Sequence, residues 1–290
     1  MSNGEEKSSA NAGVSRGRLL ILVTAVLWSL AGVFIKALEL HPLTIVFYRS
    51  LFAALFFIPL VRRKSWTINL PVLVSALSYT AAISLFVSAN KLTTAANSIV
   101  LQYSAPIFVF IFARIFFREA ISKLNLLTLI AGTVGVVVIF AGSAGLPDMN
   151  GVGIALLSGL FFSIYMTNLR FLKETEPAYL TLANNLACSI VLLPWVQSQL
   201  ALTAVEAATL CVMGVIQLGI PYFLFCKGLE KVSLQEASLI VLVEPVLNPI
   251  WVALVFGEIP SRPTLIGGGI ILVSLGFRYG WPSWQKNVEF

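Results

Sequence analysis

Long apolar stretches follow one another along almost the whole chain, with only short polar breaks between them. They are continuously apolar and do not alternate every second residue, which indicates helices rather than the strands of a membrane barrel. A helix needs about 20 apolar residues to cross a bilayer. We therefore predict ten transmembrane helices, over residues 19–38, 43–61, 70–90, 94–114, 124–142, 151–170, 178–198, 204–226, 233–256 and 263–279.

The positive charges orient these helices. If the N-terminus is cytoplasmic, 15 of the 19 Lys and Arg residues fall on the cytoplasmic side. Only Lys36, Lys91 and Arg262 fall on the other side, and Arg49 lies inside the second predicted span. Membrane proteins usually keep their excess Lys and Arg in the cytoplasm. We therefore expect both termini to be cytoplasmic.

Composition agrees with an all-α integral membrane protein. The chain is 58% hydrophobic and only 11% charged, with a mean hydropathy of +0.91. So few charged side chains do not supply the polar surface of a soluble domain, which excludes soluble enzymes and nucleic-acid-binding proteins. The net charge of +6 therefore reflects orientation in the bilayer, and we expect no nucleic-acid partner.

Most catalytic chemistry is also absent from the sequence. There is one His (His41) and one Asp (Asp148), and the three Cys residues are far apart. These counts exclude an aspartate dyad, a His-rich zinc site and a disulfide framework. No phosphate-binding loop of an ATP-driven pump is present. We expect no enzyme activity, no metal and no cofactor; a channel or an intramembrane enzyme remains the less favoured alternative.

The two halves of the chain repeat the same landmarks. Trp28 and Phe162 each stand eight residues before a cation, at a constant offset of 134. The other matched landmarks are Pro42 and Pro59 with Pro177 and Pro194, Pro106 and Glu119 with Pro245 and Glu258, and Thr128 to Gly132 with Thr264 to Gly268. Coincident spacings of this kind indicate an internal duplication.

Each half contains five predicted spans, so the second half enters the membrane from the opposite side. Two inverted five-helix repeats are typical of secondary transporters that work by alternating access. The predicted plan is a disordered cytoplasmic arm (1–18), a first repeat (19–142), a linker (143–150), a second repeat (151–279) and a cytoplasmic tail (280–290).

The repeat plan and the ends of the fourth and ninth spans resemble a known family. Ser104-Ala105-Pro106 to Arg118-Glu119 and Val243-Glu244-Pro245 to Gly257-Glu258 are similar to the EamA-type branch of the drug/metabolite transporter superfamily. The first half departs from the pattern, with Ala105 and Arg118 in place of Glu and Gly. The resemblance covers residues 17 to 280. It implies a ten-helix inner-membrane carrier that exports small metabolites, often amino acids, and within the family the chain looks most like bacterial aromatic amino-acid exporters.

Glu244 is the strongest candidate site residue, because charged groups inside a membrane are rare and usually functional. Pro245 follows it directly and removes a backbone hydrogen bond, which leaves a carbonyl free. Asn248 and Trp251 share its helical face, and the three together could hold an ammonium group and a side chain. Glu244 could couple transport to protons, or transport could be facilitated diffusion. The alternative is that Glu244 only hydrogen-bonds another helix.

Further polar and aromatic residues near the middle of the spans complete the predicted cavity. For each of them a helix-to-helix contact is the alternative reading. They are Trp28, Tyr79, Ser98, Gln102, Tyr103, Phe162, Tyr165, Gln217 and Tyr222. Their substrate would be an amino acid, or a drug or sugar conjugate if the subfamily resemblance misleads.

Three remaining features are expected to act in support. Arg49 is the only cation placed within a span away from the span's ends, and we assign it a gating, partner or substrate role, with snorkelling to the outer interface as the alternative. Glu119 and Glu258 are expected to cap or bridge the loops that follow them. The last span of each half carries small residues, Ala131 and Gly135 in the first and Gly267, Gly268 and Gly269 in the second. Small residues allow close helix approach, so we expect these two helices to support the fold or to dimerise, in a monomer or a weak dimer within the lipid bilayer.

Overall fold

The fold is helical throughout the part of the chain that the structure describes. The computed structural model describes residues 2–62, 66–92, 98, 101–141, 149–257 and 262–288. In its first half the helices are α1 (Ser2–Trp28), α2 (Ala31–Ala37), α3 (Pro42–Phe57) with η1 (Ile58–Leu60), α4 (Leu70–Leu92), α6 (Ala105–Phe117) and α7 (Lys123–Ala141). No strand occurs within these ranges.

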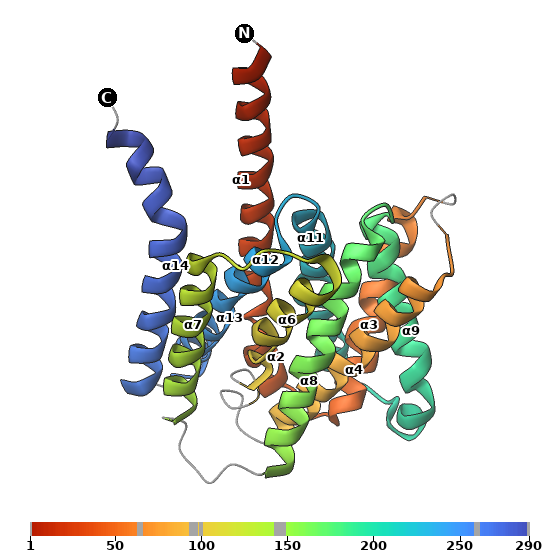
Figure 1. The fold of residues 1–290 in the computed structure, drawn as a ribbon. Coiled ribbons are helices and arrows are strands. Elements are labelled where there is room, and N and C mark those ends of the chain that lie inside the picture. Colours follow the sequence, from red (N-terminus) through yellow and green to blue (C-terminus); the bar gives the residue numbers. More distant parts are fainter. Residues whose placement is uncertain are drawn as a thin grey trace.

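The second half has the same character with more interruptions. Its helices are α8 (Met149–Asn168) with η3 (Leu169–Leu172), α9 (Pro177–Val196) with η4 (Gln197–Gln199), α10 (Ala204–Val212), the π-helical η5 (Met213–Gly219), α11 (Ile220–Leu229), α12 (Leu234–Ile240), η6 (Val241–Val243), α13 (Glu244–Phe256) and α14 (Arg262–Val288). Helices α1 and α14 have their outer ends on the same side of the bundle (Figure 1).

Eight helical segments among the described residues are long and apolar enough to cross a membrane. They coincide with eight of the ten predicted spans, so a multi-pass membrane protein is confirmed. In the region of the predicted fourth span the described helix α6 has 13 residues, and 93–97 and 99–100 lie outside the described part. The predicted tenth span falls within α14. The count of ten stays a prediction.

The outer surface of the bundle is apolar, unlike that of a soluble protein, while the core is apolar as well. Large apolar side chains point outward, such as Leu77, Ile190 and Val273, whose exposed fractions are 62%, 63% and 73%. Arg49 and Glu244 are buried instead, with exposed fractions of 1% and 7%. A bilayer favours this arrangement because it solvates apolar groups and penalises charges.

The expected disordered arm differs from the structure. Helix α1 begins at Ser2, so residues 2–18 continue the first span as one helix. The segment includes three Gly and two Asn and is a weak helix former by itself, but extending an existing helix requires no new nucleation. The tail likewise continues α14 as far as Val288.

The helices of the two halves interdigitate. The most extensive packing pairs are α4 with α8, α7 with α14, α3 with α9, and α1 with α11, and each pair joins one half to the other. Helix α1 of the first half corresponds to α8 of the second, and α4 corresponds to α11. The pair α4 with α8 in one half-to-half contact is therefore equivalent to the pair α11 with α1. In the other two pairs, α3 with α9 and α7 with α14, each helix packs against its own counterpart. The interior of the protein is therefore a joint product of both halves.

Helices α7 and α14, which end the two halves, approach each other at glycines and stand side by side in Figure 1. A Cβ atom at Gly135 would lie 2.6 Å from the carbonyl oxygen of Gly267, and a Cβ at Gly267 would meet the carbonyl oxygen of Gly135. Backbone contact of this kind is how small residues pack membrane helices. Gly269, two residues further along α14, has no such neighbour within 4 Å.

We expect Gly267→Ala to destabilise the protein and Gly269→Ala to leave it unchanged or slightly more stable. Both changes improve helix propensity, but only the first introduces a methyl group into a backbone contact, which costs about 1–3 kcal/mol. The thermal unfolding midpoints of the two variants in the same detergent test this. Equal midpoints would show that α7 and α14 can separate without cost.

The ends of α6 and α13 share a left-handed cap. Arg118 after α6 has φ 51°, and Gly257 after α13 has φ 71°. These are corresponding positions of the two halves, and only the second carries the residue that adopts this conformation without steric cost. The departure of Arg118 from the family pattern therefore changes the residue and keeps the turn.

Arg118→Gly should stabilise the protein by about 1 kcal/mol, since it removes the steric cost of a side chain in the left-handed region. Arg118→Ala is the matched control. It also removes the charge but keeps a Cβ, so its unfolding midpoint should not rise. A gain of the same size in both variants would assign the effect to charge and not to backbone geometry.

Candidate functional site

Three interruptions in the helices meet near the middle of the bundle, and the first is at Pro245. A proline cannot donate the hydrogen bond that the carbonyl four residues earlier would accept, and here that carbonyl belongs to Val241. The chain responds with the short 3-10 segment η6, in which the Glu244 N–H reaches Val241 instead. The hydroxyl of Tyr103 donates a second bond to the same carbonyl, at 2.9 Å.

The second interruption separates α1 from α2. Around the break, carbonyl groups accept bonds from side chains of other helices. The Gln217 amide donates to the Trp28 carbonyl at 3.3 Å, and the Asn248 amide donates to the Ser29 carbonyl at 2.8 Å. Gly32 makes room for this contact, because a Cβ there would lie 2.6 Å from the Asn248 amide.

The third interruption is the π-helical segment η5, which precedes Pro221. This proline leaves the carbonyl of Gln217 without its usual α-helical donor, and the widened turn accommodates the loss. Gly214 in the same segment packs directly on the backbone of Arg49. The π segment therefore sets how closely the eighth span lies against the second.

A cavity lies where these interruptions meet. It is narrow, with a volume of about 40 Å³, enough for a few water molecules. Its lining comes from both halves and consists of Trp28, Ala31, Arg49, Ile83, Phe86, Gln102, Tyr103, Ala105, Pro106, Phe162, Met166, Gln217, Leu218, Tyr222, Ser238, Val241 and Glu244.

Aromatic rings form one wall of the cavity. Trp28 lies 5.6 Å from Phe162 and 4.7 Å from Tyr222, measured between ring centroids. Tyr222 also contacts Tyr79 at 4.8 Å and Tyr165 at 5.6 Å. The repeat-related pair Trp28 and Phe162 therefore meets directly. Such a cluster provides apolar faces and edges that suit a planar or aliphatic side chain.

Glu244 sits against Tyr103 on another part of the lining. The Tyr103 hydroxyl is 2.5 Å from Glu244 Oε2 and 2.9 Å from the Val241 carbonyl oxygen. The phenol has one proton for these two acceptors. With Glu244 ionised, the phenol donates to the carboxylate. With Glu244 protonated, the acid donates to the phenol oxygen, and the phenol donates to Val241. The pair thus has a distinct hydrogen-bond arrangement for each protonation state.

Arg49 is also in the lining and is buried. Its Nε and Nη2 atoms have no hydrogen-bond partner among the described residues. The snorkelling alternative is therefore wrong: the close packing of α3 against α9 and η5 keeps this side chain in the interior. Its repeat-related residue Asn184 is buried as well.

Eight of the predicted site residues line the cavity, and five do not. Those in the lining are Trp28, Arg49, Gln102, Tyr103, Phe162, Gln217, Tyr222 and Glu244. Asn248 and Trp251 instead bind Ser29, the latter through its indole N–H to the hydroxyl at 2.8 Å. Tyr79 donates to the Asn185 amide oxygen at 2.8 Å and, with Tyr165, supports the wall from behind. Ser98 is buried and is not among the residues that line the cavity.

Both Gln102 and Tyr103 reach the lining, although consecutive residues of a regular helix point in different directions. The chain leaves the regular helix after Gln102 and forms a turn at Tyr103 and Ser104 before α6 begins. The rotation of about 100° between consecutive helical residues therefore does not apply to this pair. Sequence reasoning missed the apolar lining, including Ile83, Phe86 and Met166. An apolar residue facing lipid and one facing a cavity look alike in the sequence.

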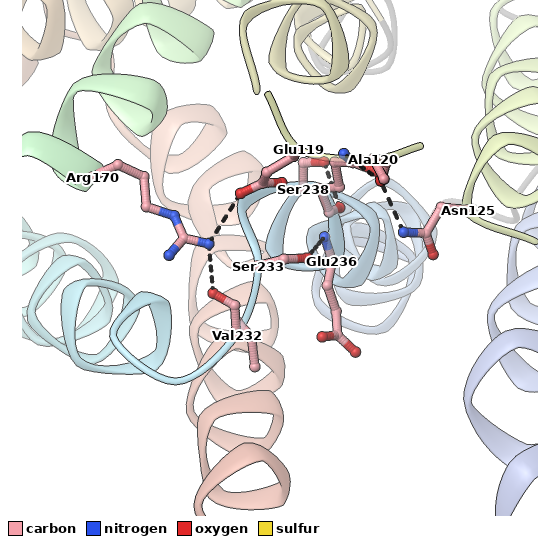
Figure 2. Close-up of polar contacts among 9 residues, drawn as sticks. Glu119, Ala120, Asn125, Arg170, Val232, Ser233, Glu236 and Ser238 are labelled. Carbon is pink, nitrogen blue, oxygen red and sulfur yellow. Dashed lines mark hydrogen bonds and ion pairs between the residues drawn. The ribbon is translucent and has the colours of Figure 1, made fainter. Parts of the chain in front are cut away.

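Polar contacts close one end of the bundle, one turn beyond the cavity. Figure 2 shows Arg170 directed toward both Glu119 and the carbonyl of Val232, at 3.4 and 2.9 Å. Gln235 donates to the Ala120 carbonyl, and Ser238, which lines the cavity, donates to the Gln235 carbonyl. This end latch, defined by Glu119, Arg170, Val232 and Gln235, joins helix ends of both halves.

The partner of Glu119 corrects an expectation. The sequence predicts that Glu119 caps or bridges the loop that follows it, but it pairs with Arg170, 51 residues away. Arg118 occupies the left-handed cap, and Arg170 arrives from the end of α8 through the packing of the two halves. Arg18 makes a comparable ion pair with Glu236, at 2.8 Å, on the same side. Glu258 lies outside the described residues.

The EamA-like transporter family matches the chain twice, over residues 15–141 and 149–279. The chain belongs to this family. The subfamily of aromatic amino-acid exporters is not thereby established. As a member of a transporter family it is a membrane transporter and not an enzyme.

Several relatives of this EamA-like transporter carry the same general description. An uncharacterized transporter of Archaeoglobus fulgidus is 26% identical over 261 residues, which cover 89% of this chain and 94% of that protein. The uncharacterized transporter YdfC of Bacillus subtilis is 27% identical over 196 residues, 66% of this chain and 64% of that protein. A solved crystal structure with 16% identity covers 92% of this chain and 97% of its own, with a TM-score of 0.80, which shows the same fold.

Removing the charge of the latch should loosen this end of the transporter. Cys226 is buried in a small pocket beside Leu169 and Leu172, which flank Arg170. We expect Arg170→Gln to raise the rate of maleimide labelling of Cys226 about fivefold, since losing a charge-assisted contact shifts an equilibrium by about 1 kcal/mol. The assay uses a parent chain in which Cys188 and Cys211 are alanine.

Lys123→Gln is the matched control for this assay, because Lys123 is an exposed cation at the start of α7 and does not line the pocket of Cys226. Its labelling rate should equal that of the parent. If Arg170→Gln also labels at the parent rate while both proteins elute as folded monodisperse samples, the latch does not hold this end closed.

Proposed function

We propose that this chain is a secondary transporter of a bacterial inner membrane that exports amino acids, aromatic or other neutral ones, by alternating access. The observation that carries the proposal is the carboxyl group of Glu244 inside a narrow, aromatic-lined cavity built by both halves. Both termini would be cytoplasmic, and the latch of Figure 2 would then close the cytoplasmic end.

The chemistry of the cavity suits an amino acid. The Glu244 carboxylate is a partner for the ammonium group, and the phenol of Tyr103 is a further oxygen beside it at 2.5 Å. The rings of Trp28, Phe162 and Tyr222 offer faces to the substrate's side chain and to the cation. An amphipathic pocket with a few polar groups is the usual design of a site for a small molecule.

The small volume of the cavity fits a carrier between its open states. A space of about 40 Å³ does not hold an amino acid, so helices must separate for substrate to enter. Carriers of this architecture open by rocking one set of helices against another around a fixed site. The breaks in α1–α2, η5 and η6 lie at the cavity and supply flexible points for such a movement.

Proton antiport through Glu244 is the proposed coupling. A proton on Glu244 removes the charge that attracts the ammonium group, so substrate and proton compete for one residue. The two hydrogen-bond arrangements of Tyr103 give each state a satisfied partner. Competition at a shared carboxyl group is sufficient for exchange of the two across the membrane.

The test is counterflow of labelled L-phenylalanine, L-tryptophan, L-leucine and L-threonine into proteoliposomes, with and without an acidic interior. The wild type should exchange at least one of them saturably and accumulate it when the interior is acidic. Glu244→Gln should lose the pH-driven accumulation and bind substrate about 10- to 100-fold more weakly, because a charged hydrogen bond becomes a neutral one.

Glu174→Gln, at an exposed loop position, is the control and should behave as the wild type. Accumulation that survives in Glu244→Gln would move the coupling to another residue. A folded wild type that exchanges none of the four amino acids would contradict the proposed substrate class.

A further inference from the structure

Arg49 carries a buried positive charge that the described protein does not neutralise. Its side chain lines the cavity, its exposed fraction is 1%, and two of its three nitrogen atoms, Nε and Nη2, have no partner among the described residues. No described carboxylate oxygen lies within 4 Å of it. An unpaired guanidinium inside a membrane protein is costly, so a structure that keeps one has a use for it.

The helices around Arg49 supply no countercharge. Its own helix α3 packs against α9, α4, α10 and η5. The only carboxylate on these elements is Glu206 of α10, which is exposed and held by the backbone and hydroxyl groups of Thr203. The repeat-related Asn184 of α9 is neutral. The described elements packed around Arg49 therefore contain no buried carboxylate that could turn toward it and form an ion pair.

Two further polar atoms in the same cavity lack partners. The indole N–H of Trp28 is buried and donates to nothing described, and the amide oxygen of Gln217 accepts from nothing described. The Gln217 amide nitrogen is already committed to the Trp28 carbonyl. The cavity thus presents two N–H groups of the Arg49 guanidinium and the Trp28 indole N–H as donors, and the Gln217 amide oxygen as an acceptor. This set matches an anionic oxygen acceptor.

We infer that Arg49 binds the carboxylate of the transported compound, with the Trp28 indole N–H as an additional donor. The inference rests on the proposed function and narrows it. Arg49 and Glu244 line one cavity with opposite charges, so the ligand they fit is a zwitterion whose ammonium group faces Glu244. Lipophilic amines, neutral drugs and uncharged sugars lack the group that Arg49 requires.

Guanidinium geometry makes this assignment testable. Its parallel N–H groups bind a carboxylate through two bonds, which a lysine ammonium does not reproduce. A site built to bond a polar group also rejects an analogue without that group, because its own donors stay unpaired. Discrimination between an acid and its decarboxylated analogue therefore reports on Arg49 directly.

The experiment measures inhibition of L-phenylalanine counterflow by L-phenylalanine itself and by phenethylamine, which lacks only the carboxylate. The wild type should prefer the amino acid by at least about 100-fold. In Arg49→Gln the preference should fall to about threefold or less, through weaker binding of the amino acid and not of the amine. Arg49→Lys should recover only part of the preference.

Folding and charge are controlled separately. Arg114→Gln makes the same change at an exposed position of α6 and should keep the wild-type preference. As a readout that needs no transport, 3-phenylpropionate should raise the unfolding temperature of the detergent-solubilised wild type, whereas 3-phenylpropanol should not. In Arg49→Gln this carboxylate effect should disappear while the melting transition stays cooperative.

The outcomes separate the two proposals. Saturable exchange of amino acids with equal inhibition by phenethylamine would overturn the carboxylate site and leave the exporter standing. Stabilisation of the wild type by 3-phenylpropionate that depends on Arg49, without exchange of any amino acid, would support the carboxylate site and contradict the amino-acid exporter. A carboxylate effect that survives in a folded Arg49→Gln protein overturns the inference.

Discussion

A backbone carbonyl that loses its helical partner inside a bilayer has no water to replace it, and the interior of this protein is organised by that constraint. Pro245 deprives the Val241 carbonyl of its usual donor, and the hydroxyl of Tyr103 compensates from the turn before α6. At the break after α1, side-chain amides from the second half serve the carbonyls of Trp28 and Ser29. Two of these three side chains, Tyr103 and Gln217, also line the cavity. Function and helix repair therefore share these two residues.

The sequence predicts most of the spans and the more polar part of the site, and it does so for identifiable reasons. Charged or amide side chains in apolar runs are rare, so Glu244, Arg49 and Gln217 are conspicuous. Partner choice is not encoded locally. Asn248 and Trp251 share a helical face with Glu244, yet they bind Ser29, because a glycine lets α2 approach that face closely. The pairing of Glu119 with Arg170 depends on how the two halves pack, which residue spacing does not reveal.

The two charged residues of the cavity occupy different situations. Glu244 has a close hydrogen-bond partner whichever way its proton lies, so its environment tolerates both charge states. Arg49 is a cation whose Nε and Nη2 have no partner among the described residues, and the helix α9 packed against its own helix is neutral. Glu244 is suited to gain and lose a proton, whereas Arg49 is suited to bind an anionic ligand. A site of this kind uses different residues for the exchange of a proton and for the recognition of an anion, although both residues line the same cavity.

The way the halves pack has a geometric consequence. Because exchanging them leaves the pairs α3 with α9 and α7 with α14 unchanged, these two contacts lie on the axis that relates the halves. Points on this axis do not move when each half adopts the conformation of the other. The contacts α4 with α8 and α1 with α11 are off the axis, and a switch between two end states related by this axis makes each contact adopt the geometry of the other. The glycine contact of α7 and α14 would then be the pivot of the movement. The contacts α4 with α8 and α1 with α11, which exchange geometries, would rearrange around the cavity that Arg49 lines.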